Sequence, residues 1–185
     1  VAVPYAHFVD FVPGTADVVI VMEDLAPRSQ GDQIGGCSFD EAALALSQAA
    51  KLHSAFWHKK ELSELAWVSR RTPEQVEQTI ALMDLLQPAF VDRYRSDLTA
   101  EALDLSNRFA SDASHWFDGL PRPVSLAHGD FRLDNLMFAD PDTSILPKLV
   151  VVDWQTITHS HGAHDVAYFV GSAFEPKLRR VHEEQ

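Results

Sequence analysis

Positive charge is scarce in this chain. It holds 15 lysines and arginines against 27 aspartates and glutamates, which gives a formal net charge of -12. No run of lysine or arginine is longer than two residues. This composition argues against nucleic acid and against an anionic membrane surface as a partner, and it is compatible with a cationic substrate.

Cysteine and long apolar runs are equally scarce. Cys37 is the single cysteine, so no disulfide can form within the chain and a reducing compartment fits. No segment approaches the roughly 20 apolar residues of a membrane span, and no basic-then-apolar signal peptide is visible. With 46% hydrophobic residues, the 185-residue chain can bury a core, and we expect a cytoplasmic globular protein.

The most informative stretch covers residues 124–138. Apolar residues at its two ends predict strand, loop and strand. Within the loop, Asp130 and Asn135 are separated by four residues, the D-x-x-x-x-N spacing of a kinase-type catalytic loop. Phosphoryl transfer requires a carboxylate that deprotonates the attacking hydroxyl and an oxygen ligand that holds magnesium on the phosphates. One short loop can carry both.

A second carboxylate follows a strand further along. The residues 149–152 are apolar and mostly β-branched, and they end on Asp153, which would lie beside the loop as a magnesium ligand. Each residue taken singly has a plainer interpretation, because a Gly-Asp pair is usually a turn and an Asp after a strand is often a helix cap. Their combination and order favour a kinase-type site.

The motif His-Gly-Asp-Phe-Arg-Leu-Asp-Asn at 128–135, followed by Val-Val-Asp-Trp at 151–154, resembles a known superfamily. It is similar to the aminoglycoside phosphotransferases and choline kinases, especially their choline-kinase-like and ecdysteroid-kinase-like branch. The resemblance runs from about Val18 to Gly171. It implies that Asp130 is the catalytic base, that Asn135 and Asp153 bind magnesium, and that ATP is the phosphoryl donor.

The same resemblance assigns a hinge between two lobes to the residues after the strand 18–22. Glu23, Asp24 and Leu25 would bind the adenine edge of ATP through main-chain groups. A polar strand end remains the alternative for these three residues.

Two further residues receive supporting roles from the resemblance. Asp165, at the start of a helix over 165–170, would anchor the backbone of the catalytic loop by hydrogen bonds. His128 would hold the shape of the loop and would not carry a proton. A simple helix N-cap at Asp165 is compatible with the first role.

Strands and turns frame the first part of the chain. The residues 1–10 and the β-branched run 18–22 predict an antiparallel pair, with a turn at Pro13-Gly14 between them. Residues 28–36 are polar and rich in glycine but match no phosphate-loop pattern, so we predict a flexible connector. Residues 156–164 also predict a polar loop.

Three helices are predicted in the middle of the chain. Ser38 and Glu41 form a capping box that opens a helix to about Lys59, in which His53 and Trp57 are interpreted as packing residues. A second capping box, Thr-Pro-Glu-Gln at 72–75, opens a helix with an apolar stripe that ends near Tyr94. The third helix extends from 98–99 to Gly119, and its stripe includes Leu105, Phe109, Ala113 and Trp116.

The order of these elements predicts an α+β fold and not an alternating βαβ arrangement. It matches a protein-kinase-like fold that has a mostly helical C-terminal lobe and only the last strands and hinge of the N-terminal lobe. Residues 1–25 would form the end of the N-lobe sheet and the hinge. Residues 26–185 would form the helical C-lobe that carries the catalytic loop and the metal-binding strand.

Part of the family pattern is absent. The first lysine is Lys51, Arg28 is the one lysine or arginine among the first fifty residues, and no glycine-rich loop precedes Val18. The family's phosphate-gripping lysine is expected before the hinge. We therefore expect a fragment cut at both ends, and a degenerate kinase-like protein is the rival interpretation.

The leading functional hypothesis is an ATP-dependent phosphotransferase acting on a hydroxyl of a small molecule. A non-catalytic kinase-like binding module is one alternative, because the lysine and the glycine-rich loop are missing. A metal-dependent hydrolase is the other, since imidazoles and carboxylates are common zinc or iron ligands. Its candidate ligands are His159, His161, His164, His128, Asp130 and Asp165. The sequence does not indicate the particular substrate or the oligomeric state.

Overall fold

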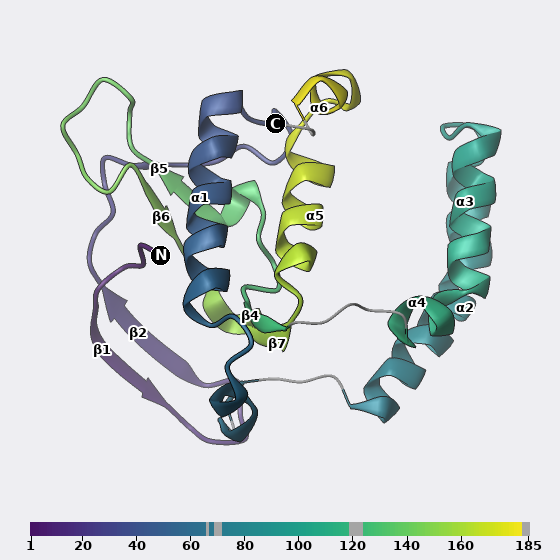
Figure 1. Cartoon of the computed structure of the whole chain (residues 1–185), viewed down its shortest axis with the longest axis horizontal. Helices are drawn as coiled ribbons and strands as arrows, with labels where there is room; N and C mark the ends of the chain where they lie inside the picture. The colour runs from purple at the N-terminus through teal and green to yellow at the C-terminus, as the bar shows by residue number, and fades with distance from the viewer. Residues whose placement is uncertain (66, 69–71, 119–123, 183–185) are drawn as a thin grey trace. The chain divides into compact units, whose positions relative to one another are not determined.

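A computed structural model gives the architecture of the chain and describes residues 1–65, 67–68, 72–118 and 124–182 (Figure 1). The chain folds as two compact units. The first comprises residues 1–69 and 123–185, and the second comprises residues 70–122. The described strands and the catalytic-loop motif belong to the first unit, while the second consists of helices.

The strands β1 (Ala6–Phe11) and β2 (Val18–Met22) pair in antiparallel fashion. Gly14, with φ of +81°, lies in the turn that joins them. The predicted antiparallel pair is confirmed, although the first strand begins at Ala6 and not at Val1. The side chains of both strands are exposed, so within the described residues this ribbon adds nothing to the buried core.

Two small antiparallel sheets surround the catalytic loop. One has the order β3 (Ser29–Gln30), β5 (Leu136–Phe138) and β6 (Leu149–Val151), and in the other β4 (Ser125–Ala127) pairs with β7 (Thr158–Ser160). The predicted strands on both sides of the loop and before Asp153 are confirmed.

Two segments that were predicted as irregular take part in these sheets. The prediction of a flexible connector over 28–36 is wrong, because Ser29 and Gln30 pair with β5. The predicted polar loop over 156–164 likewise contains β7. Both strands are very short and polar, and they form because a partner strand satisfies their backbone groups. Their side chains show no apolar alternation that could have revealed them.

The helix α1 (Phe39–Ala55) begins at the predicted capping box. The Glu41 carboxylate accepts a hydrogen bond from Ser38 N–H at 2.9 Å, and Ser38 Oγ accepts one from Glu41 N–H at 3.3 Å. The helix ends at Ala55 and not near Lys59. The chain turns there because His58 adopts a left-handed backbone with φ of 54° and donates its N–H to the carbonyl of residue 124. The buried apolar residues of α1 are Ala42, Ala45, Ala49 and Leu52, and the polar Gln48 and His53 are buried beside them.

The core of the first unit lies between α1, the β3–β5–β6 sheet and α5 (Gly162–Ala173). Figure 1 shows α1 and α5 side by side. Phe131 and Leu133 of the catalytic-loop motif are among its largest fully buried side chains. The remaining elements of this unit are α6 (Pro176–His182) and short 3-10 turns at Lys60–Glu64, Leu133–Asn135 and Trp154–Thr156.

The second unit contains α2 (Pro73–Tyr94), α3 (Ala100–Ser111) and α4 (Ala113–Asp118). The predicted capping box of α2 is present, with reciprocal hydrogen bonds between Thr72 and Gln75. The prediction of a single third helix is wrong, because the helix is interrupted at Asp112 and forms α3 and α4. The predicted end of that helix at Gly119 lies outside the described residues.

The apolar stripes of the second unit are less buried than the sequence predicts. The helix α2 holds no buried residue among those described. On the α3–α4 stripe Ala113 is buried, but Leu105 is 60% exposed, so its predicted core position is wrong. None of the helices within the described ranges combines the length and apolar character that crossing a membrane requires.

Candidate active site

The catalytic-loop motif occupies residues 128–135 between β4 and β5, and Gly129 makes its first turn possible. Gly129 has φ of +87°, and a Cβ atom there would collide with the backbone carbonyl of Thr156. The Thr156 hydroxyl donates to the His128 carbonyl at 3.0 Å and so holds the two segments together. Both the backbone conformation and the available space therefore require glycine at this position.

Asp165, in the first turn of α5, binds the backbone of this turn. Its Oδ2 accepts a hydrogen bond from His128 N–H at 2.8 Å, and its Oδ1 accepts one from Gly129 N–H at 2.9 Å. The Asp165 side chain is completely buried. These are the contacts that the family resemblance implies for Asp165.

The Asp165 carboxylate also faces two histidines. His53 Nε2 donates to Oδ2 at 2.9 Å, and His164 Nδ1 lies 3.9 Å from Oδ1. Burial alone would raise the pKa of Asp165. The contacts with His164 and His53 and the N–H groups of Gly129 and His128 act in the opposite direction, and they hold this pKa well below its ordinary value of 3.8. The carboxylate is therefore ionised at neutral pH.

His53 and Trp57 were both predicted to be packing residues, and both behave differently in the structure. His53 is buried, but it does more than pack, since it donates to Asp165. A Cβ atom at Gly162 would lie 2.6 Å from its Nδ1, so the glycine leaves room for the ring. Trp57 is 54% exposed, and the prediction that it packs is wrong.

His128 is fully buried beneath the loop and is bonded through both ring nitrogens. Its Nε2 lies 2.9 Å from the Val152 carbonyl, and because a carbonyl can only accept, Nε2 carries the proton. Its Nδ1 accepts the N–H of Asp130 at 3.3 Å. A ring that donates from one nitrogen and accepts at the other is the neutral tautomer. His128 therefore joins the loop to the end of β6.

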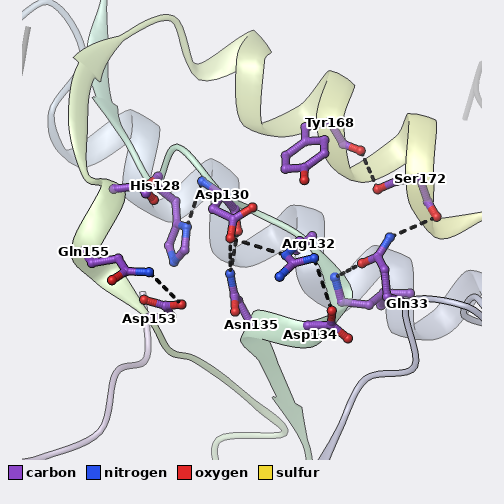
Figure 2. A network of polar contacts seen from close by, with 12 residues as sticks. Gln33, His128, Asp130, Arg132, Asp134, Asn135, Asp153, Gln155, Tyr168 and Ser172 are labelled. Carbon is purple, nitrogen blue, oxygen red and sulfur yellow. Dashed lines mark hydrogen bonds and ion pairs between the residues drawn. The ribbon is translucent and has the colours of Figure 1, made fainter. Parts of the chain in front are cut away.

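The structure brings Asp130 and Asn135 together at the centre of the site (Figure 2). Asn135 Nδ2 donates to the carbonyl of Asp130 at 2.8 Å and to its Oδ2 at 3.0 Å. Asn135 is 5% exposed, whereas the Asp130 side chain is 26% exposed. No donor within the described residues binds Asn135 Oδ1 or Asp130 Oδ1. Each side chain thus keeps one oxygen for another partner.

Asp153 follows β6 and lies next to Asn135. Val152 N–H donates to the Asn135 carbonyl at 3.0 Å, one step beyond the β5–β6 pairing, and Figure 2 shows the Asp153 carboxylate pointing towards Asn135. Asp153 is exposed, and its one hydrogen bond within the described residues comes from Gln155 at 3.4 Å. Its backbone is left-handed, with φ of 61°. Such strain is concentrated at functional sites.

A second set of contacts holds the far end of the catalytic loop. Gln30 Nε2 donates to the Asp134 carbonyl at 2.6 Å, and Gln33 Oε1 accepts Leu133 N–H at 2.9 Å. Gln33 Nε2 also donates to the Ser172 carbonyl of α5 at 3.2 Å, as Figure 2 shows. Neither glutamine could be recognised from the sequence, because nothing distinguishes them within a polar segment before β3 is paired with β5.

Charged and apolar residues alternate along the loop. Phe131 and Leu133 are each 1% exposed, while Asp130, Arg132 and Asp134 point to the opposite, more open side. Arg132 Nε lies 3.3 Å from Asp130 Oδ2, and Arg132 Nη1 lies 3.2 Å from Asp134 Oδ2. No role for Arg132 was predicted from the sequence. The Asp-Phe-Arg-Leu-Asp alternation was the available signal, because alternate side chains of an extended chain share one face.

Glu23, Asp24 and Leu25 follow β2 directly. Glu23 N–H donates to the Tyr5 carbonyl at 2.9 Å, and the Leu25 carbonyl accepts Arg28 N–H at 2.9 Å. Within the described residues, the Glu23 carbonyl and the Leu25 N–H have no hydrogen-bond partner. One acceptor and one donor of the main chain are thus available two residues apart.

The ranges that the structure describes contain no group of three or more His, Cys, Asp or Glu residues that could hold a metal ion. The alternative of a hydrolase site requires such a group from its histidines and aspartates, and the structure lends it no support. Asp153 and Asn135 form a different kind of pair, one carboxylate and one amide. Magnesium is commonly held by one or two protein ligands together with substrate phosphates.

The arrangement of elements is that of the protein-kinase-like phosphotransferases. An aminoglycoside-3'-phosphotransferase of type VIII aligns with a TM-score of 0.54 and 19% identity, over 99% of this chain and 65% of its own. A choline/ethanolamine kinase family protein from Mesorhizobium loti aligns with a TM-score of 0.51 and 18% identity, over 96% of this chain and 53% of its own. The chain therefore spans 65% and 53% of these two proteins.

The sequence then places the chain within that class. The profile of the ecdysteroid kinase-like family matches residues 2–185, so the chain belongs to this family. No curated protein matches it. The resemblance drawn from the motif at 128–135 and the predicted α+β kinase-like fold are both confirmed.

Proposed function

We propose that this chain carries the phosphoryl-transfer site of an ATP-dependent kinase that acts on a hydroxyl group of a small molecule. The observation that carries the proposal is the pairing of Asp130 with Asn135 beside Asp153, in which each residue keeps an oxygen for another partner. Membership of the ecdysteroid kinase-like family and the kinase-like fold support it.

Asp130 is the proposed base. The hydroxyl oxygen of the substrate attacks the γ-phosphorus of ATP, the bond from that phosphorus to the β-phosphate oxygen breaks, and ADP leaves. The hydroxyl proton passes to Asp130. Asn135 holds the carboxylate through Oδ2, which leaves Oδ1 to receive the proton. Fixing the carboxylate in this way removes a large part of the entropic cost of bringing the reacting groups together.

Asn135 Oδ1 and the Asp153 carboxylate are the proposed magnesium ligands. Both side chains offer oxygen ligands, and they lie on adjacent backbone segments. No donor within the described residues binds Asn135 Oδ1, and Asp153 accepts one long hydrogen bond, from Gln155 at 3.4 Å. Oxygen ligands of this kind fit magnesium. When bound, the ion neutralises charge on the phosphates.

Residues 23–25 are proposed to bind the adenine ring. The Glu23 carbonyl provides an acceptor and the Leu25 N–H a donor, and neither has a partner within the described residues. An adenine edge offers an amino donor next to a ring-nitrogen acceptor. Binding through main-chain groups leaves the Asp24 side chain free to bond with the Ala26 N–H, as it does at 2.9 Å.

The acceptor substrate is proposed to be a small hydroxylated molecule. The two solved relatives are named for aminoglycosides and for choline or ethanolamine, and the family is named for ecdysteroids. A hydroxyl group is the feature that these compounds share. The net charge of -12 supports a small-molecule partner over a nucleic acid.

A non-catalytic kinase-like binding module is the second candidate. One specific observation favours it. Arg28, which follows the proposed hinge, donates to the Pro147 carbonyl at 3.1 Å, so its guanidinium is bound to a main-chain acceptor.

Calorimetric titration of Mg-ATP into the chain tests the leading proposal. We expect saturable, magnesium-dependent binding that is lost in Asp153→Ala. Asp104→Ala is the matched control, because it also removes an exposed aspartate but from a surface ion pair of the second unit. Absence of binding by the unaltered chain, or equal binding by Asp153→Ala, would contradict the proposed site. With binding established, Asp130→Asn should abolish transfer to a panel of hydroxylated substrates, and turnover by that variant would rule out Asp130 as the base.

A further inference from the structure

We propose that Arg132 is the phosphate-binding cation of the catalytic loop and that its guanidinium receives oxygens of the transferred phosphoryl group. The inference rests on the proposed function and extends it to a residue between the base and the metal ligands. Arg132 extends to the same face of the loop as Asp130, so it lies where the phosphoryl group must meet the attacking hydroxyl.

Two carboxylates hold the guanidinium from different sides. Asp130 Oδ2 lies 3.3 Å from Nε, and Asp134 Oδ2 lies 3.2 Å from Nη1 (Figure 2). The loop backbone at Arg132 is extended, with φ of -141°, and the flanking Phe131 and Leu133 are anchored in the core. The arginine is therefore fixed in place by backbone, core and charge before any ligand binds, which lowers the entropic cost of binding.

The donors of Arg132 are only partly used. The Nε atom is buried and makes no aligned hydrogen bond within the described residues, so its contact with Asp130 is an ion pair alone. Nη2, with two N–H groups, has no acceptor there either. Because Nε is buried against Asp130, Nη2 is the nitrogen of the guanidinium that remains for a ligand. A planar guanidinium matches the spacing of phosphate oxygens, which it binds through two parallel hydrogen bonds.

Two other cations of the first unit are bound to main-chain carbonyls. Arg28 donates to the Pro147 carbonyl, and Lys148 donates to the carbonyl of Pro141 at 2.9 Å. Lys51 is the first lysine of the chain and lies on α1. Among the described residues, Arg132 is the one lysine or arginine that forms an ion pair with Asp130. It is thus the cation that can meet a phosphate at the base.

The test compares Mg-ATP with adenosine, both titrated by calorimetry. Arg132→Gln should weaken Mg-ATP binding by about tenfold or more, because charged hydrogen bonds are lost, and should leave adenosine binding unchanged. Arg132→Lys keeps the charge but lacks the planar guanidinium, so its affinity for Mg-ATP should lie between those of the unaltered chain and Arg132→Gln. Arg108→Gln is the matched control, since it breaks another arginine–aspartate ion pair in the second unit and should change neither affinity.

The possible outcomes separate the two proposals. If the unaltered chain binds Mg-ATP and Arg132→Gln binds it equally well, the role of Arg132 is wrong and the proposed function stands. If the unaltered chain binds Mg-ATP no more tightly than adenosine, the phosphate-binding role of Arg132 is likewise excluded. If it binds neither, both proposals fail together. Arg132→Lys keeps the test open should the glutamine variant not fold.

Asp134 is assigned as a positioning residue that acts through Arg132. Asp134→Asn should weaken Mg-ATP binding less than Arg132→Gln, and the double variant should show no further loss, because the two residues act as one unit. Asp134→Asn should also shift the Nη resonance of Arg132 in the nitrogen NMR spectrum of the free chain, because Asp134 contacts Nη1. Independent, additive losses with an unmoved resonance would exclude the positioning role.

Discussion

The Oδ1 atom of Asp165 accepts the N–H of Gly129 at 2.9 Å, although the two residues are 36 positions apart in the sequence. The other oxygen of the same carboxylate binds His128 N–H and His53. One buried charge therefore ties α1, α5 and the first turn of the catalytic loop together. The geometry of the loop depends on this charge as much as on the loop's own sequence.

Replacing Asp165 with asparagine should destabilise the first unit by about 3 kcal/mol. An amide keeps the shape, but its NH2 group faces an N–H donor of the loop that then lacks an acceptor. Urea unfolding followed by circular dichroism measures the change. Asp104→Asn, an exposed aspartate in a surface pair, should shift the free energy of unfolding by less than about 1 kcal/mol. Equal effects of the two substitutions would contradict the anchoring role.

Stability should depend on acid through the same group. Because the pKa of Asp165 is lower in the folded chain than its ordinary 3.8, the unfolded chain takes up a proton more readily as the pH falls. The contribution is complete above the ordinary value and is lost as the pH falls below it towards the folded pKa. Between about pH 4 and pH 2 the unaltered chain should lose more stability than Asp165→Asn. Parallel losses in the two proteins would show that another group is responsible.

Alanine substitutions at Gly14 and Gly129 should distinguish the cost of a strained backbone from the cost of a steric collision. Gly14 and Gly129 have φ of +81° and +87°, but a Cβ atom at Gly14 would meet nothing within 4 Å, whereas one at Gly129 would strike Thr156. Gly14→Ala should cost about 1 kcal/mol of unfolding free energy, and Gly129→Ala about 3 kcal/mol or more. Thermal and urea unfolding of both variants check this order. A smaller cost at Gly129 than at Gly14 would be incompatible with the close approach of Thr156.

Two substitutions of Asp153 should have different effects on stability but the same effect on ligand binding. Its left-handed backbone favours glycine, so Asp153→Gly should be more stable than Asp153→Ala by about 1 kcal/mol. Both variants lack the carboxylate and should lose magnesium-dependent binding of Mg-ATP to the same extent. Urea unfolding and calorimetry on the pair separate the two properties. Greater stability of the alanine variant would contradict the observed backbone conformation.

Much of the fold could be predicted because local signals agreed with the global arrangement. The capping boxes at Ser38 and Thr72 fixed two helix starts, and β-branched runs fixed β2 and β6. The strands β3 and β7 could not be predicted, since they are polar and form only by pairing with β5 and β4. The break between α3 and α4 at Asp112 also escaped, because the apolar spacing continues across it.

The site shows the same division. The spacing of the motif placed Asp130 and Asn135 in one loop, and the strand before Asp153 indicated the third residue. The roles of these residues and of Glu23, Asp24 and Leu25 remain predictions. The contacts of Gln33 and His53 could not be foreseen, because each joins segments that are distant in the sequence and neither residue type indicates a partner.

The alternation in the catalytic loop has a mechanical consequence. Phe131 and Leu133 are buried in the same core that joins α1, α5 and the β3–β5–β6 sheet, so the loop cannot lift away without exposing that core. The backbone that carries Asp130 and Arg132 is therefore held in place by the core. A motion that admits or releases ligands must take place in other parts of the chain. Substitutions in the interior, such as Phe131→Leu, would then alter the alignment of the charged groups without touching a ligand.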